Sequence, residues 1–382
     1  MLRVRLPVAV FALCLPLVAA AAAAKPEKAV VAYLFPQDGV LQPGQVDALS
    51  LTRINYAFAN IADGRMVKGF SHDDENYAFL VALKKQNPSL TVLVSVGGWL
   101  WSTDFSDVSL TQKSREVFIQ SVMEFLEKYH LDGLDIDWEF PNSPGAGHPY
   151  RREDKQNFTL LIKELRARFD KETARTHERL YLTIAAGADN EFLTNTEMAE
   201  AQRYLDSVNL MCYDYYEPGS EPTTGNHAPL FVDPADPRKV SAAASIDAYL
   251  KAGVPPEKLV LGMPFYGHVW GEVPDVNHGL FQPGKPVPHA WARYSGIPDL
   301  LKQGYVRYWD SAASVPYLYN SDKRIFVSYE DPQSVAAKCN YVLLHHLGGV
   351  MFWEYTNDPS GALLHTIRDA FHPPSQRSDA KP

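Results

Sequence analysis

Cysteine is scarce in this chain, which has three among 382 residues. Cys14 lies in an apolar N-terminal stretch, and the residues before it, Phe11-Ala12-Leu13, fit a lipoprotein attachment site poorly, so lipidation is not predicted. The other two are Cys212, in a predicted strand, and Cys339, in a predicted helix. We expect two buried free thiols, with a single bridge as the alternative that an exported protein would permit.

Long apolar runs are missing except at the N-terminus. Arg3 and Arg5 precede the apolar residues 6–18, and an alanine run at 19–24 supplies small side chains for cleavage. This pattern predicts a signal peptide over residues 1–24 and a secreted or periplasmic protein with no membrane contact after cleavage. A membrane anchor is the alternative, which the shortness of the strongly apolar part disfavours.

Positive charge is also in short supply. The formal net charge is −9, and cleavage near Ala24 would leave 34 basic against 45 acidic side chains, a charge of −11. This excess disfavours nucleic acid as a partner. It suits a neutral or cationic polymer, or serves solubility alone.

A glycine-rich phosphate loop is missing after the first predicted strand, which weakens the alternative of a doubly wound open sheet. Strand-like segments alternate with amphipathic helix patterns, as is typical of a parallel sheet. Eight such units predict an α/β protein built as a (β/α)8 TIM barrel. The strand candidates are residues 30–34, 53–59, 91–96, 133–139, 180–186, 207–213, 259–265 and 350–354, and the helix candidates are 112–130, 153–168, 241–252 and 332–347.

One connection is too long for a simple βα unit, because roughly 80 residues separate the seventh and eighth predicted strands. We therefore expect an α+β insertion over residues 268–345, within a catalytic barrel that spans residues 25–371. The polar tail at residues 372–382, rich in Pro and Ser, is predicted to be disordered.

Four acids stand in the segment 132–140, which reads DGLDIDWEF. Because side chains alternate along a strand, Asp135, Asp137 and Glu139 share one face, and the opposite face is apolar. Three neighbouring carboxylates repel one another, so one carboxyl can stay protonated near neutral pH and act as an acid. The alternative is an edge strand with a solvated acidic face, which the apolar opposite face disfavours.

The spacing D-x-x-D-x-D-x-E resembles the signature of family 18 glycoside hydrolases, the chitinases and their relatives. Four more segments resemble family motifs in the same order. They are SVGGW at 95–99, MCYD at 211–214, LGMPFYG at 261–267 and GGVMFWE at 348–354. The resemblance implies a TIM barrel that hydrolyses β-1,4 bonds between N-acetylglucosamine units of chitin or its oligosaccharides. It also implies that the insertion forms one wall of the substrate groove.

The resemblance assigns catalytic roles to five residues. Glu139 protonates the glycosidic oxygen, and Asp137 stabilises the acetamido group of the reacting sugar. Asp135, deeper in the barrel, holds Asp137 through a shared proton. Tyr213 and Asp214 flank the same sugar. Asp132, at the start of the strand, is interpreted as structural.

Seven further residues are expected to bind substrate or to shape the cleft. Ser95 and Tyr33 are predicted to contact the buried Asp135. Trp99 is expected to stack on a sugar, and Trp353 to form the floor of the reacting subsite, although a lone Trp on a strand is more often core. The full set is Tyr33, Ser95, Gly98, Trp99, Met211, Tyr266 and Trp353.

The implied mechanism is substrate-assisted, retains the anomeric configuration and needs no cofactor or metal. The expected partners are chitin or N-acetylglucosamine oligosaccharides, bound by a monomer. Three alternatives stay open: an endo-β-N-acetylglucosaminidase acting on glycoproteins or peptidoglycan, a non-catalytic chitin-binding protein, and a metal-dependent hydrolase that uses the acids as ligands.

Overall fold

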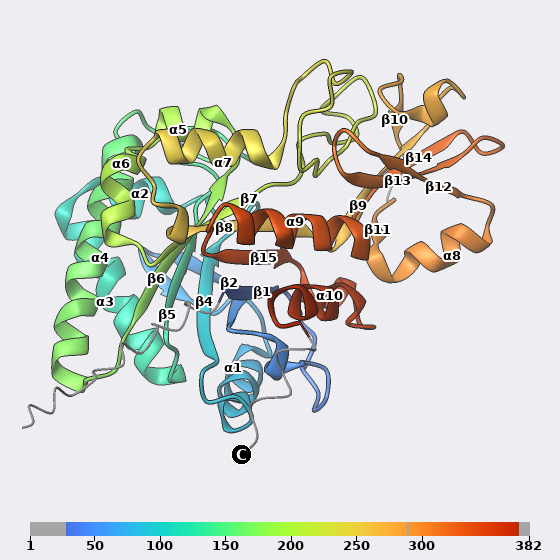
Figure 1. Cartoon of the computed structure of the whole chain (residues 1–382). Helices are drawn as coiled ribbons and strands as arrows, with labels where there is room; N and C mark the ends of the chain where they lie inside the picture. The colour runs from blue at the N-terminus through green and yellow to red at the C-terminus, as the bar shows by residue number, and fades with distance from the viewer. Residues whose placement is uncertain (1–27, 289, 374–382) are drawn as a thin grey trace, which may run out of the picture.

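A computed structural model describes residues 28–288 and 290–373, so the predicted signal peptide and residues 374–382 of the predicted tail lie outside the described residues. Eight parallel strands close into a barrel surrounded by helices, which confirms the predicted TIM barrel (Figure 1). Pairing runs in the order β1-β15-β8-β7-β6-β5-β4-β2, and β2 closes the ring on β1. The barrel strands are β1 Ala29–Leu34, β2 Arg53–Ala62, β4 Thr91–Gly97, β5 Gly133–Asp137, β6 Tyr181–Gly187, β7 Ser207–Met211, β8 Leu259–Pro264 and β15 Gly349–Trp353; the short β3, Arg65–Val67, extends β2.

Helices fill the connections between the barrel strands. The predicted helix at 112–130 is observed as Gln112–Tyr129, and Thr111 caps its first turn through a reciprocal bond with Ser114. The helix predicted at 153–168 continues to Thr176, because Phe169 extends the buried stripe by another turn. The helices are α1 Asp73–Ala82, α2 Phe105–Leu110, α3 Gln112–Tyr129, α4 Asp154–Thr176, α5 Asn190–Asn195, α6 Met198–Ala201, α7 Ala242–Lys251, α9 Pro332–Leu344 and α10 Ala362–Phe371. Within the described ranges, none of the helices combines the length and apolar character needed to cross a membrane.

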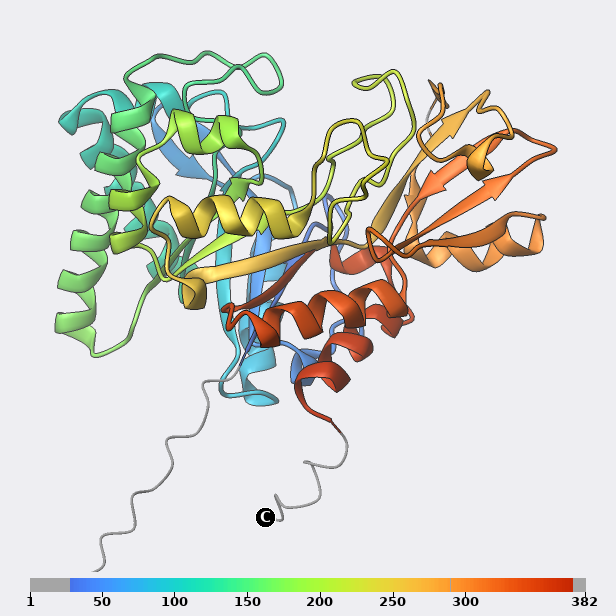
Figure 2. The same cartoon turned by 45° about the horizontal axis from the view of Figure 1, so that its top comes forward.

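A second sheet is inserted between β8 and β15. Its strands pair in the order β10-β9-β14-β13-β12, with β11 beside β9, and all of these pairs are antiparallel. Figure 2 shows this sheet beside the barrel, next to the long connection that follows β7. Its elements are β9 Tyr266–Gly271, β10 Lys285–Pro286, β11 Ala292–Arg293, α8 Ile297–Lys302, β12 Val306–Asp310, β13 Val315–Asn320 and β14 Ile325–Ser328.

Apolar and polar side chains divide between the two faces of the barrel wall. Leu134 and Ile136 of β5 point outward into the large core between strands and helices. Asp135 and Asp137, with the opposite parity, point into the barrel, as the period of two predicts. The barrel interior is therefore partly polar, and its small apolar cluster is formed by Val31, Tyr33, Ala185, Val260 and Met351.

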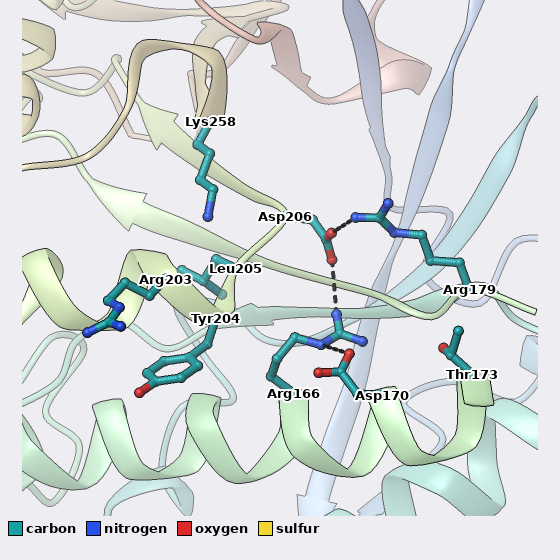
Figure 3. Close-up of a pocket in the computed structure, with 9 residues that line it drawn as sticks. All are labelled: Arg166, Asp170, Thr173, Arg179, Arg203, Tyr204, Leu205, Asp206 and Lys258. Atoms are coloured by element: carbon teal, nitrogen blue, oxygen red, sulfur yellow. Dashed lines mark hydrogen bonds and ion pairs between the residues drawn. The ribbon is translucent and has the colours of Figure 1, made fainter. Parts of the chain in front are cut away.

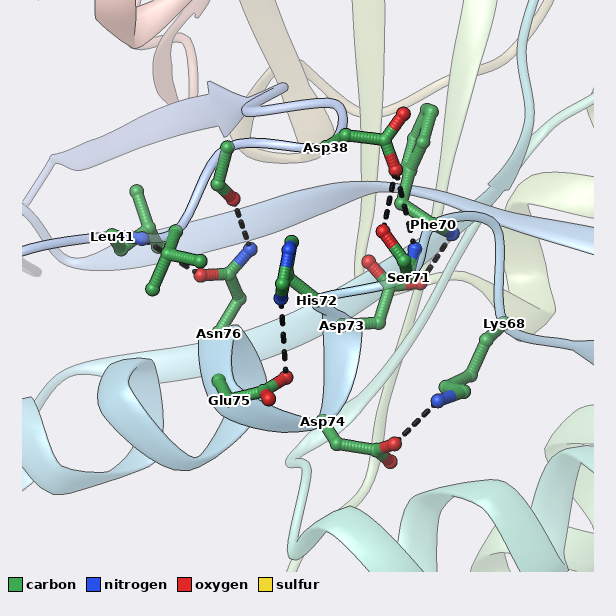
Figure 4. A network of polar contacts seen from close by, with 12 residues as sticks. Asp38, Leu41, Lys68, Phe70, Ser71, His72, Asp73, Asp74, Glu75 and Asn76 are labelled. Carbon is green, nitrogen blue, oxygen red and sulfur yellow. Dashed lines mark hydrogen bonds and ion pairs between the residues drawn. The ribbon is translucent and has the colours of Figure 1, made fainter.

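Polar contacts fasten the connection after β1 to the start of α1 (Figure 4). Asp73 is fully buried and accepts bonds from the Tyr56 hydroxyl at 2.6 Å and the backbone amides of Gly69 and Phe70. Asn76 accepts from the Leu41 amide at 2.9 Å and donates to the Gly39 carbonyl. These contacts give the buried polar groups partners and hold the chain near the top of β1 and β2.

Candidate active site

The acid segment lies where β5 ends at the C-terminal edge of the barrel. Asp135 and Asp137 belong to the strand and are buried, with 0% and 4% exposure, whereas Glu139 lies two residues past the strand and is partly exposed. Pairing ends at Asp137 opposite Gly97 of β4. Functional side chains of TIM barrels gather at this end, because the loops after the strands surround it.

Asp135 is held by four donors from four strands. The hydroxyls of Tyr33 and Ser95 donate to Oδ2 at 2.9 and 2.8 Å, which confirms both contacts predicted from the sequence. Thr183 and Asn209 donate to Oδ1. Burial raises the pKa of Asp135, and the hydrogen bonds from Thr183, Ser95 and Tyr33 counteract that rise by stabilising the charged form.

The proton predicted to be shared between Asp135 and Asp137 stays a prediction. Both oxygens of Asp135 already accept hydroxyl or amide donors. The carboxyl of Asp137 interacts with Glu139, and its Oδ1 atom is buried without a hydrogen-bond partner.

Glu139 and Asp137 form an electrostatically coupled pair. Burial raises the pKa of Glu139 to about 8, and the negative charge of Asp214 adds to the rise. Burial also raises the pKa of Asp137, followed by the charges of Glu139 and Asp135. Two adjacent carboxyls in this setting retain at least one proton near neutral pH, so the pair contains an acid that can donate it.

The loop after β4 fixes the backbone that carries Glu139. The Ser102 hydroxyl accepts from the Glu139 amide at 2.9 Å and contacts the carbonyls of Gly98 and Asp137. The Gly98 amide donates to the Asp137 carbonyl at 2.7 Å. Gly97 and Gly98 have φ values of 105° and 81°, which favour glycine, so the chain can turn beside Asp137.

Asp214 lies past the end of β7 with a left-handed φ of 59°. The Tyr266 hydroxyl donates to its two oxygens at 2.6 and 2.7 Å, and His268 Nε2 lies 2.7 Å from Oδ1. His227 Nδ1 lies 3.6 Å from the same oxygen. Burial would raise the pKa of Asp214, but the two imidazoles outweigh it and hold the carboxyl below its usual pKa. Asp214 is therefore a stable anion.

A hollow of about 310 Å³ opens beside these residues. Met211, Tyr213, Asp214, Asp189 and Arg238 are among the residues that line it. The Tyr213 ring packs edge-on against Tyr266, with 6.1 Å between centroids. Tyr213 and Tyr266 belong to two separate sequence motifs, and the fold brings them into contact.

Aromatic rings form the surfaces next to the acids. Trp353, at the end of β15, stacks on Phe58 with an interplanar angle of 20°. Trp99 is 50% exposed and lies edge-on to Phe140, the residue after Glu139. Trp291, just before β11 of the inserted sheet, is equally exposed. Its ring stacks on the Tyr266 ring, with 4.3 Å between the two centroids. Exposed rings of this kind are suited to contact with sugar faces.

Sequence reasoning missed several residues of the site. Thr183 and Asn209 are polar residues in otherwise apolar strands, and this contrast was the available signal. His227 and His268 lie in segments without a motif, and Ser102 lies in a turn. Local sequence patterns do not report contacts between segments that are far apart in the chain.

The opposite end of the barrel contains a larger hollow of about 520 Å³, lined by charged residues (Figure 3). Its charges largely pair with one another. Asp206 lies between Arg179 and Arg166, at 2.5 and 3.3 Å, and Arg166 also pairs with Asp170 at 2.7 Å. Asp132 behaves similarly at the start of β5, where it accepts from the Val92 amide at 2.7 Å, so its structural interpretation is confirmed.

Comparisons with known proteins agree on one family. The family model described as "Glycosyl hydrolases family 18" matches residues 29–358. "Chitinase A1" of Niallia circulans is 41% identical over 302 residues, which are 75% of this chain and 43% of that protein. A solved family 18 N-acetylglucosaminidase from Paenibacillus barengoltzii superposes with a TM-score of 0.81 at 38% identity, over 90% of this chain and 99% of that one. A class V chitinase from Nicotiana tobaccum in complex with NAG4 has a TM-score of 0.82 at 29% identity, over 91% and 99% of the two chains.

The chain spans less than half the length of Chitinase A1, the relative with 41% identity. The match to the family model nevertheless runs through all eight barrel strands and the inserted sheet. This chain belongs to glycosyl hydrolase family 18.

Proposed function

We propose that this protein hydrolyses β-1,4 bonds between N-acetylglucosamine units of chitin or its oligosaccharides, with retention of configuration. The observation that carries the proposal is the pair formed by Glu139 and Asp137. The pKa of Glu139 is raised to about 8, and the neighbouring carboxyl of Asp137 keeps one buried oxygen without a hydrogen-bond partner. Glu139 can therefore donate a proton at neutral pH, and the free Asp137 oxygen can accept a hydrogen bond from the acetamido N–H of a bound sugar.

In the proposed reaction, Glu139 gives its proton to the glycosidic oxygen as the bond to the anomeric carbon breaks. The acetamido carbonyl oxygen of the same sugar attacks that carbon and forms an oxazolinium ion. Asp137 accepts a hydrogen bond from the acetamido N–H, and Tyr213 orients the carbonyl. Glu139, now a base, takes a proton from water, and the water oxygen bonds to the anomeric carbon as the bond from that carbon to the acetamido oxygen breaks, which restores the acetamido group.

The remaining residues are proposed to bind substrate. Trp353 supplies the floor beneath the reacting sugar, and Trp99 and Trp291 offer exposed rings for neighbouring sugars. Tyr266 and Asp214 form a hydrogen-bonded wall. Ser95 and Gly98 are proposed to position the acids. Ser95 donates to the Asp135 carboxylate, and the Gly98 amide donates to the Asp137 carbonyl. Met211 lines the hollow beside Tyr213.

We also propose that residues 1–24 direct export, so that the mature protein acts as a monomer in the periplasm or outside the cell. The support is the basic, apolar and alanine-rich order of this segment. Residues 25–371 would then form one catalytic unit, with the insertion at 268–345 as a wall of the groove.

The first experiment is hydrolysis of an N-acetylglucosamine hexamer by wild type and Glu139→Gln, with product anomers resolved by NMR. Wild type is expected to release β-anomers first. The variant is expected to lose roughly 10²–10⁴-fold in rate, the range typical of lost acid–base catalysis, while keeping its fold. Products that appear first as α-anomers, or a variant as fast as wild type, would refute the mechanism.

A second candidate activity is release of single N-acetylglucosamine units. The observation that favours it is the match to a solved N-acetylglucosaminidase over 99% of that chain. Chromatography of early hexamer products separates the two activities. Dimers and trimers indicate chitinase action, whereas monosaccharide accompanied by pentamer indicates the alternative.

A further inference from the structure

Three side chains from separate segments meet beside the acids of β5. Asp214 follows β7, His227 lies in the connection between β7 and α7, and His268 is in β9 of the inserted sheet. One ligand atom of each can be chosen so that all three lie within 4.8 Å of one another. His268 Nε2 is 2.7 Å and His227 Nδ1 is 3.6 Å from Asp214 Oδ1.

His227 is the unusual member of this group. Its side chain has 0% exposure, its Nε2 has no hydrogen-bond partner, and its Nδ1 lies 3.6 Å from Asp214 Oδ1, just beyond hydrogen-bond distance. A buried polar group without a partner is costly, so its presence calls for an explanation such as a ligand.

The backbone around His227 holds the ring in place. The His227 amide donates to Ser328 Oγ at 2.9 Å, and its carbonyl accepts from the Tyr215 amide at 3.1 Å. The neighbouring Ala228 carbonyl accepts from the buried Lys338 ammonium at 2.7 Å. The two imidazole rings lie edge to face, with centroids 4.9 Å apart. The ring positions are thus set by contacts that do not use the ring nitrogens of His227.

The donor set defines the chemistry of the ligand. Two imidazole nitrogens and one carboxylate oxygen suit Zn²⁺, Cu²⁺ or Ni²⁺, whereas Ca²⁺ and Mg²⁺ prefer oxygen ligands. A tetrahedral zinc ion bound at about 2.1 Å separates its ligand atoms by roughly 3.4 Å. The distances from Asp214 Oδ1 to His268 Nε2 and to His227 Nδ1, 2.7 and 3.6 Å, lie below and above this value. Small side-chain rotations would therefore complete three bonds to the ion. The side chain of Asp214 is 34% exposed, which gives an ion access from the cleft.

We propose that Asp214, His227 and His268 form a binding site for a divalent transition metal ion, and that the bound ion blocks the reacting subsite. The ion would take the carboxylate oxygen that now accepts from Tyr266, and it would occupy space beside the sugar. Metal binding does not depend on the proposed chitinase activity, whereas the inhibition that follows from it does.

The test is calorimetric titration of ZnCl₂ into metal-free protein without a polyhistidine tag. Wild type is expected to bind one Zn²⁺ per chain, and MgCl₂ is expected to give no binding heat. His227→Gln and His268→Gln should each weaken the zinc site at least about tenfold, since each removes a ligand. His365→Gln is the matched control, because His365 also faces an aspartate, Asp47 at 3.5 Å, but without a second imidazole. It should bind zinc as wild type does.

A second measurement keeps the proposal testable if His227→Gln fails to fold. Cobalt in a tetrahedral site with nitrogen and oxygen ligands absorbs visible light, and wild type plus Co²⁺ should show such a band that Zn²⁺ abolishes and His268→Gln lacks. The proposal is overturned if wild type binds neither ion stoichiometrically, or if His268→Gln binds as wild type does. If wild type binds zinc but hydrolyses none of the substrates tested without it, the proposed function fails and the metal site stands.

Discussion

At the scale of single residues, the candidate site is governed by how negative charges share a small volume. Asp135 is stabilised by hydroxyl and amide donors, and Asp214 by Tyr266 and His268. Glu139 accepts no comparable set, so burial and the charge of Asp214 raise its pKa to about 8. Neighbouring carboxyls of the same type thus acquire different protonation states from their surroundings.

The fall of activity at alkaline pH (the alkaline limb) should reflect the loss of the proton from Glu139. Because the protonated form is the acid, kcat/KM is expected to fall as the pH rises through about 8. Asp214→Asn removes a charge that favours the proton on Glu139, so the limb should move to lower pH by roughly one unit. Glu217→Gln, which removes a lesser contribution, should produce a smaller shift in the same direction.

The measurement is the pH profile of kcat/KM for the three proteins on a soluble N-acetylglucosamine oligomer. A limb that stays in place in Asp214→Asn, or moves to higher pH, would contradict the assignment of Glu139 as the acid that titrates. A shift larger in Glu217→Gln than in Asp214→Asn would contradict the order of the two charges.

At the scale of elements, the turn after β4 determines where β5 delivers its acids. Gly97 has a left-handed φ of 105°, and a Cβ atom there would lie 2.2 Å from the Asp137 carbonyl oxygen and 2.6 Å from the Phe105 ring. The strand that ends in Asp137 and the helix that starts with Phe105 both approach this glycine. A side chain at position 97 would therefore displace the end of β5, the start of α2 or both.

Gly97→Ala should destabilise the fold by roughly 2–4 kcal/mol, since it combines an unfavourable φ with a clash against backbone. Gly296→Ala is the control, because a Cβ at Gly296 meets nothing within 4 Å and φ is −86°. The control should change stability by less than about 1 kcal/mol. Urea unfolding measures both, and equal midpoints for the two variants would contradict the packing argument.

At the scale of the whole molecule, one buried ion pair joins three parts of the chain. Lys338 of α9 and Glu330, which follows β14, have 0% exposed side chains and contact each other. Lys338 also donates to the Ala228 carbonyl in the connection after β7. The barrel helix, the inserted sheet and the segment that carries His227 therefore meet at a single ammonium group.

Lys338→Met should destabilise the protein by about 3–5 kcal/mol, because Glu330 would be left buried without its partner. The double variant Lys338→Met/Glu330→Gln should recover much of that loss, since it removes the unpaired charge. Equilibrium unfolding in urea gives both values. A double variant that is less stable than Lys338→Met would show that the pair does not act as a unit.

The sequence by itself determined the strand order, the direction of Asp135 and Asp137 and several residues of the candidate site. These follow from short periods: alternation along β5 places Asp135 and Asp137 inside the barrel, and repeated strand–helix units produce a parallel ring. Ser95 was found because its strand pairs with β5, whereas Tyr33 lies on β1, which β2 and β4 separate from β5, and contacts Asp135 inside the barrel. The family motifs supplied Tyr213, Asp214 and Trp353.

Only the tertiary structure decided which side chains meet at the candidate site. Asp135 accepts from side chains of four strands, and a one-dimensional pattern does not show which of them meet there. His227 and His268 reach Asp214 from a long connection and from the inserted sheet. Their approach depends on how the sheet packs beside the barrel, which is a property of long-range contacts rather than of local sequence.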